Sequence, residues 1–130
     1  REDYLEMLEF VEAERLVDHV DPVQYAIRLL VPPGSALLDR PAIRPFLGRL
    51  DQASFMYPWT HPDPRMDDLH RAVSALVEQA TRENEDPGIT FNRVWALAQA
   101  LAFGRELSGV PAAPDPDRRR PPRLTEPWYC

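Results

Sequence analysis

The chain carries a single thiol, on its last residue, Cys130. One thiol cannot form a disulfide within the chain, and it cannot supply the several cysteines that an iron–sulfur cluster needs. Trp128 and Tyr129 directly precede it, and this pair could anchor a tail that docks on another surface. We therefore expect either a docking role for the two aromatic residues or, if a second thiol or selenol lies next to Cys130, a redox role for this cysteine.

Arg28 and Gln24 are the candidate binding residues of the segment 23–31. Its β-branched and apolar residues predict a strand, which the Pro-Pro-Gly sequence of residues 32–34 would end. Alternation places apolar residues on one face and Gln24 and Arg28 on the other, which is typical of a strand beside a polar lumen or site. There Arg28 could bind a carboxylate or phosphate, or form only a structural ion pair.

The histidines and their neighbouring aspartates raise the question of a metal site. Asp67 and His70 lie three residues apart and could share a ligand on one helix, but nothing else has the spacing of a zinc or iron site. We therefore predict no metal site. The residues considered are His19, His61, His70, Asp18, Asp63 and Asp67.

Composition excludes several functions. The 130 residues suit one modest domain, and 15 arginines against 21 acidic residues give a net charge of −6. This charge disfavours binding to nucleic acid or to an anionic membrane, and the absence of lysine excludes a Schiff-base lysine. No stretch is apolar enough to span a membrane, no secretory signal pattern is present, and one cysteine favours a reducing compartment. We expect a cytoplasmic protein.

Three helices must position these residues. Apolar periodicity predicts an amphipathic helix over 2–15 and two more over 64–83 and 91–107. Asp63 is a suitable N-cap for the second helix and Thr90 for the third. Because the loop between them is short, the last two helices are expected to form an antiparallel αα-hairpin.

Residues 110–123 have the composition of a proline-rich linker, which favours an extended chain with little to bury. The arginine run 118–120 within it is expected to be solvated. The alternative is that this run binds an acidic partner or the acidic surface of the protein itself.

Three stretches resemble one family of proteins. They are Asp18–Leu38, which contains DHVDPVQ, the predicted strand and PPGSALL; Tyr57–Asp67, YPWTHPDPRMD; and Arg123–Cys130, RLTEPWYC. Together they are similar to the C-terminal part of the CUAEP/CCAEP-tail radical SAM (seleno)proteins. The tail is the most specific of the three matches.

The resemblance implies an α-rich α+β fragment. Residues 1–34 would be the last helix and strand of a radical SAM (partial TIM) barrel, residues 35–109 a helical extension, and residues 110–130 a disordered Pro-rich linker and Cys-ending tail. The parent enzyme would cleave S-adenosylmethionine at a [4Fe–4S] cluster and act on an unknown substrate, and its use of cobalamin is left open. The partner of this chain would be the remainder of the barrel, where Arg28 and Gln24 would face S-adenosylmethionine or substrate.

The chain departs from the family pattern in two ways. It lacks the cluster-binding Cys-x-x-x-Cys-x-x-Cys motif, so we expect it to bind no cofactor and to be inactive alone. It also stops at Cys130, where the family continues with a second cysteine or selenocysteine, so we expect a UGA selenocysteine codon to follow. The alternative function is a non-catalytic helical interaction module with a flexible Pro/Arg tail.

Overall fold

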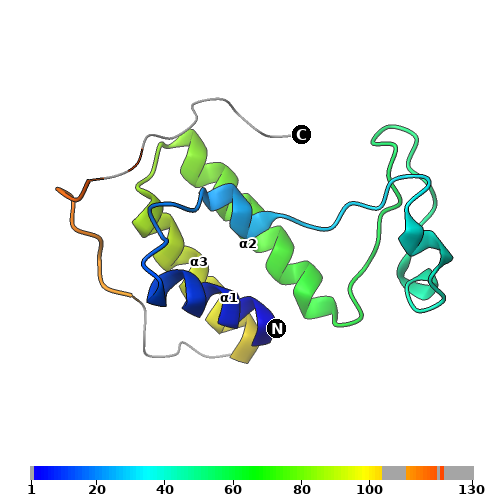
Figure 1. The fold of residues 1–130 in the computed structure, drawn as a ribbon, viewed down its shortest axis with the longest axis horizontal. Helices are drawn as coiled ribbons and strands as arrows, with labels where there is room; N and C mark the ends of the chain where they lie inside the picture. The colour runs from blue at the N-terminus through cyan, green and yellow to red at the C-terminus, as the bar shows by residue number, and fades with distance from the viewer. Residues whose placement is uncertain (1, 104–110, 120, 122–130) are drawn as a thin grey trace.

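A computed structural model describes residues 2–103, 111–119 and 121. Its helices pack together in one unit, and residues 35–60 form an irregular lobe beside them (Figure 1). None of the helices in the described ranges is long and apolar enough to cross a membrane. The helical elements are α1 (Glu2–Ala13), η1 (Pro22–Ala26), η2 (Ala36–Asp39), η3 (Arg44–Phe46), α2 (Pro64–Arg82) and α3 (Pro87–Phe103), the η elements being 3₁₀ helices.

Local signals explain where α2 begins and how it packs. The Asp63 carboxylate accepts a hydrogen bond from the Arg65 backbone N–H, and Pro64 occupies the first turn, where its missing N–H costs nothing. Apolar side chains recur on one face of the helix and are buried against the rest of the core. α2 agrees with the predicted helix 64–83 to within one residue.

The core lies where α1, α2 and α3 meet. The Phe91 ring centre lies 5.7 Å from that of Tyr25 and 5.8 Å from that of Trp95, in tilted contacts. α3 runs back beside α2 after a short loop, as expected for a helical hairpin (Figure 1). The buried residues of this core are Leu5, Leu8, Val11, Tyr25, Leu69, Val73, Val77, Phe91, Val94, Trp95 and Ala98.

The predicted start of α3 was wrong. The helix begins at Pro87, and the Asp86 carboxylate accepts a hydrogen bond from the Gly88 N–H. Thr90 is therefore not a cap: it is fully buried, and its hydroxyl donates to the Glu85 carboxylate at 2.8 Å. Residues 104–107 of the predicted helix 91–107 lie outside the described residues.

The predicted strand over 23–31 was also wrong, because in the described ranges the structure contains no strand and no sheet. The Asp21 carboxylate accepts from the Val23 N–H, and Pro22 starts the 3₁₀ helix η1 in place of a strand. Ile27 and Leu29, predicted to lie on a buried apolar face, are 64% and 53% exposed. A strand needs a neighbour to satisfy its backbone, and none of the other described segments pairs with this one as a strand. The α+β barrel fragment is thus replaced by a helical fold.

Residues 111–119 of the Pro-rich segment, which we call the strap, contact the helical unit. The Arg118 guanidinium donates to both oxygens of Asp18, at 2.7 and 2.8 Å, and to Asp86 at 2.7 Å. At the other end of the strap, the Asn92 side-chain amide donates to the Pro111 carbonyl at 3.1 Å. The prediction that the arginine run is solvated was therefore wrong for Arg118, which binds the acidic surface of its own chain.

Candidate functional site

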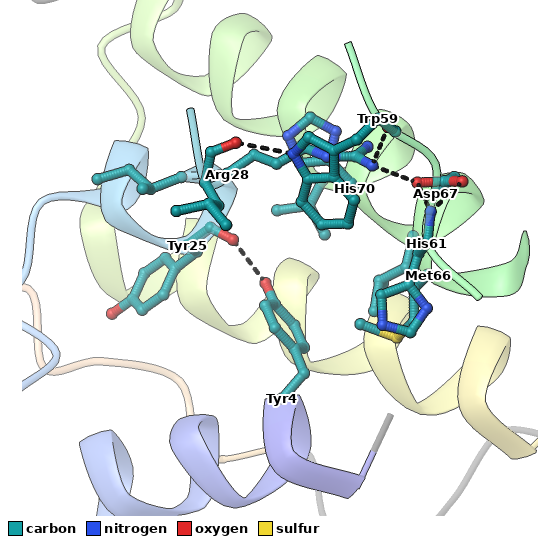
Figure 2. A pocket seen from close by; sticks show the side chains of 12 residues that line it. Tyr4, Tyr25, Arg28, Trp59, His61, Met66, Asp67 and His70 are labelled. Atoms are coloured by element: carbon teal, nitrogen blue, oxygen red, sulfur yellow. Dashed lines mark hydrogen bonds and ion pairs between the residues drawn. The ribbon is translucent and has the colours of Figure 1, made fainter. Parts of the chain in front are cut away.

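A pocket of about 200 Å³ opens between α1, η1, α2 and the segment that leads into α2. Figure 2 shows the side chains that line it; Tyr4, Arg28, Trp59 and His70 lie close together, whereas the Tyr25 ring is directed away from them. Most of its wall is apolar or aromatic, with a few polar groups, as in typical small-molecule sites. We call it the Arg28 pocket; its lining residues are Tyr4, Tyr25, Ile27, Arg28, Leu29, Trp59, His61, Met66, Asp67, Leu69, His70 and Val73.

Arg28 connects two segments that are distant in sequence. Its Nη2 donates to Asp67 Oδ1 at 2.6 Å and to the Trp59 carbonyl at 2.7 Å. The guanidinium carbon lies 4.0 Å from the centre of a Trp59 ring, a cation–π contact. The Trp59 indole N–H in turn donates to the Leu29 carbonyl at 2.8 Å. Arg28 and Trp59 therefore hold each other in place at the wall of the pocket (Figure 2).

Asp67 is the anionic partner of this arrangement. Its oxygens accept from the His61 backbone N–H at 3.0 and 3.2 Å as well as from Arg28. Burial works against its charge, but the hydrogen bonds from His61 and Arg28 together outweigh burial and lower the pKa of Asp67. The carboxylate is thus kept ionised, and hydrogen bonds already engage both of its oxygens.

Tyr4 and His70 hold the carbonyl groups at the end of η1. The Tyr4 hydroxyl donates to the Tyr25 carbonyl at 2.9 Å. His70 Nε2 lies 3.2 Å from the Ala26 carbonyl, which fixes that nitrogen as the protonated one. Burial, and to a lesser degree the neighbouring Tyr25, raises the pKa of Tyr4 above its usual range. These two hydrogen bonds hold the end of η1 in place, in the segment for which strand pairing was predicted.

The structure separates the residues predicted to share a site. Arg28 lines the pocket with a charged partner, whereas Gln24 is exposed and is not part of the wall. Cys130, Trp128 and Tyr129 lie outside the described residues.

The aspartate and histidine of the predicted shared helix face have separate partners. Asp67 binds Arg28, and His70 binds the Ala26 carbonyl. Among the residues that the structure describes, no group of three or more histidine, cysteine, aspartate or glutamate side chains could hold a metal ion.

Sequence reasoning missed the contributions of Tyr4, Trp59 and Met66 to the pocket. Tyr4 lies in the predicted helix 2–15, and no local pattern shows that its hydroxyl donates to the Tyr25 carbonyl. Trp59 and Met66 did have a signal, because they belong to the matched stretch 57–67. Only the fold shows that this stretch lies against Arg28.

Comparison of the chain with protein-family models, with curated proteins and with solved structures gave no match. The Arg28 pocket offers apolar walls, a guanidinium and an occupied carboxylate. Such a set can bind and orient a small molecule.

Proposed function

We propose that this chain is the C-terminal part of a radical SAM enzyme of the CUAEP/CCAEP-tail family. The parent enzyme would cleave S-adenosylmethionine at a [4Fe–4S] cluster to form a 5′-deoxyadenosyl radical. This chain would be inactive alone, since it has no cluster-binding cysteine motif. Its contribution would be a helical unit with a binding pocket and a tail that ends in a thiol.

One observation carries the proposal. Two of the stretches that resemble the family, 18–38 and 57–67, lie far apart in sequence but converge on the Arg28 pocket. The first supplies Arg28 and the second supplies Trp59 and Asp67, which are its direct partners. Residues from both stretches therefore meet at a single site with polar groups. This favours a shared function for these residues over a chance similarity.

Arg28 and Cys130 would have different roles in the parent enzyme. Arg28 would help to bind an anionic group of S-adenosylmethionine or substrate, because guanidinium pairs well with carboxylate and phosphate. Cys130, next to a second cysteine or selenocysteine, would form a redox pair that can exchange with disulfides.

The reading frame that contains this sequence tests the proposal. We expect an in-frame Cys-x-x-x-Cys-x-x-Cys motif upstream of Arg1. A frame that extends upstream without such a motif would refute the radical SAM proposal.

A second candidate is a non-catalytic helical interaction module. It is favoured by the apolar segment after η1, where Ile27, Leu29 and Leu30 are 64%, 53% and 64% exposed. Exposed apolar side chains this close together are typical of a surface that a partner covers. This candidate predicts an upstream frame without the cluster motif, so the same sequencing experiment separates the two functions.

A further inference from the structure

We propose that the Arg28 pocket binds a small carboxylic acid with an apolar, ring-sized body. The inference concerns this chain's own pocket and does not depend on radical chemistry in a parent enzyme. It rests on the size and lining of the pocket, on the N–H groups of Arg28 that remain available, and on the pairing of Asp67 with Arg28.

The body of the ligand follows from the volume and the wall. An apolar cavity of about 150 Å³ is large enough to hold benzene, and this pocket measures about 200 Å³. Tyr25, Met66, Leu69 and Val73 contribute apolar or aromatic surface to it. One ring with a short chain fits this space.

The acid group follows from the polar atoms. In the described part of the chain, Nη2 is the one nitrogen of Arg28 that donates a hydrogen bond, so the N–H groups on Nε and Nη1 are available. Asp67 is already paired with Arg28 and also accepts from the His61 backbone N–H. The remaining N–H groups of Arg28 are therefore the donors that a ligand can use, and a carboxylate is the group that uses a guanidinium best.

A matched pair of ligands tests the proposal on the unaltered chain. Phenylpropionate and phenylpropanol have the same ring and chain, and only the first carries a carboxylate. In an NMR titration of the ¹⁵N-labelled chain, we expect phenylpropionate to shift the Trp59 indole N–H and to bind at least about 10-fold more tightly than the alcohol. Equal affinities, or phenylpropionate shifts that are absent or lie away from the pocket, would overturn the proposal.

Two variants locate the effect. Arg28→Gln should remove the preference for the acid and leave weak binding of the ring. Arg71→Gln is the matched control, because it removes an arginine from an exposed ion pair with Asp68, outside the pocket, and it should retain the preference. An acid preference that survives in folded Arg28→Gln would refute the assignment. If that variant does not fold, the ligand pair on the unaltered chain decides.

Discussion

Replacing Arg118 with glutamine should release the strap from the helical unit. The side chains of Arg118, Asp18 and Asp86 are only 17–22% exposed, and three charge-assisted hydrogen bonds of 2.7–2.8 Å join them. The two carboxylates raise the pKa of Arg118 above its usual range, so the guanidinium stays charged. Hydrogen bonds to charged groups contribute about 1.5–3 kcal/mol net. We expect Arg118→Gln to weaken docking by about 2 kcal/mol and to raise the released fraction about 30-fold.

Limited trypsin digestion measures this release, because cleavage follows the population of the open form when opening is fast. The relevant bond is the one after Arg119, which the substitution leaves in place. Arg118→Lys should lie between the original chain and Arg118→Gln, since lysine cannot form the two-pronged contact with Asp18. Arg71→Gln, in an exposed pair elsewhere, should not change the rate.

Two results would refute the reasoning. An unchanged cleavage rate after Arg119 in Arg118→Gln would mean that Arg118 does not hold the strap. An unchanged free energy of unfolding in urea would mean that the Arg118 contacts do not contribute to docking of the strap in the folded state. The account predicts faster cleavage together with a loss of about 2 kcal/mol in the free energy of unfolding, because the docked strap is part of the folded state.

Three further predictions concern the strap and the pocket. Gly88→Ala should also speed cleavage after Arg119, because the added Cβ would lie 2.8 Å from side-chain carbons of Pro114. Asp67→Asn should lower the free energy of unfolding by about 1–3 kcal/mol at neutral pH, measured in urea. Because the folded pKa of Asp67 is lowered, its contribution is lost as pH falls below about 3.9, so the variant should lose less stability there than the original chain. Tyr4 has a raised pKa in the fold, so stability should fall as pH rises above about 10, and Tyr4→Phe should reduce this fall in alkaline unfolding curves.

Local signals predicted the helices best. The N-cap Asp63 and the apolar stripe of α2 act within a few residues, so their effect is visible in sequence. Pro87 was harder to interpret, since proline can end one helix or begin the next. The predicted helices 64–83 and 91–107 left Pro87 in the loop between them, whereas the structure places it at the start of α3.

Long-range partners explain the remaining differences. The segment 23–31 has the composition of a strand, but strand formation depends on a neighbour that the described chain does not provide. Arg28 was predicted to be a site residue from its position on that strand. The structure instead places it in a pocket through Asp67 and Trp59, which are 39 and 31 residues away. Arg118 contacts Asp18 across 100 residues, a pairing that no local pattern indicates.

The central claim is that this chain belongs to a radical SAM enzyme, and production of 5′-deoxyadenosine tests it most directly. The complete reading frame that contains this sequence would be expressed, reconstituted with iron and sulfide, reduced, and incubated with S-adenosylmethionine. We predict 5′-deoxyadenosine from the complete protein and none from residues 1–130 alone. A reconstituted complete protein that binds no iron–sulfur cluster and forms no 5′-deoxyadenosine would contradict the account.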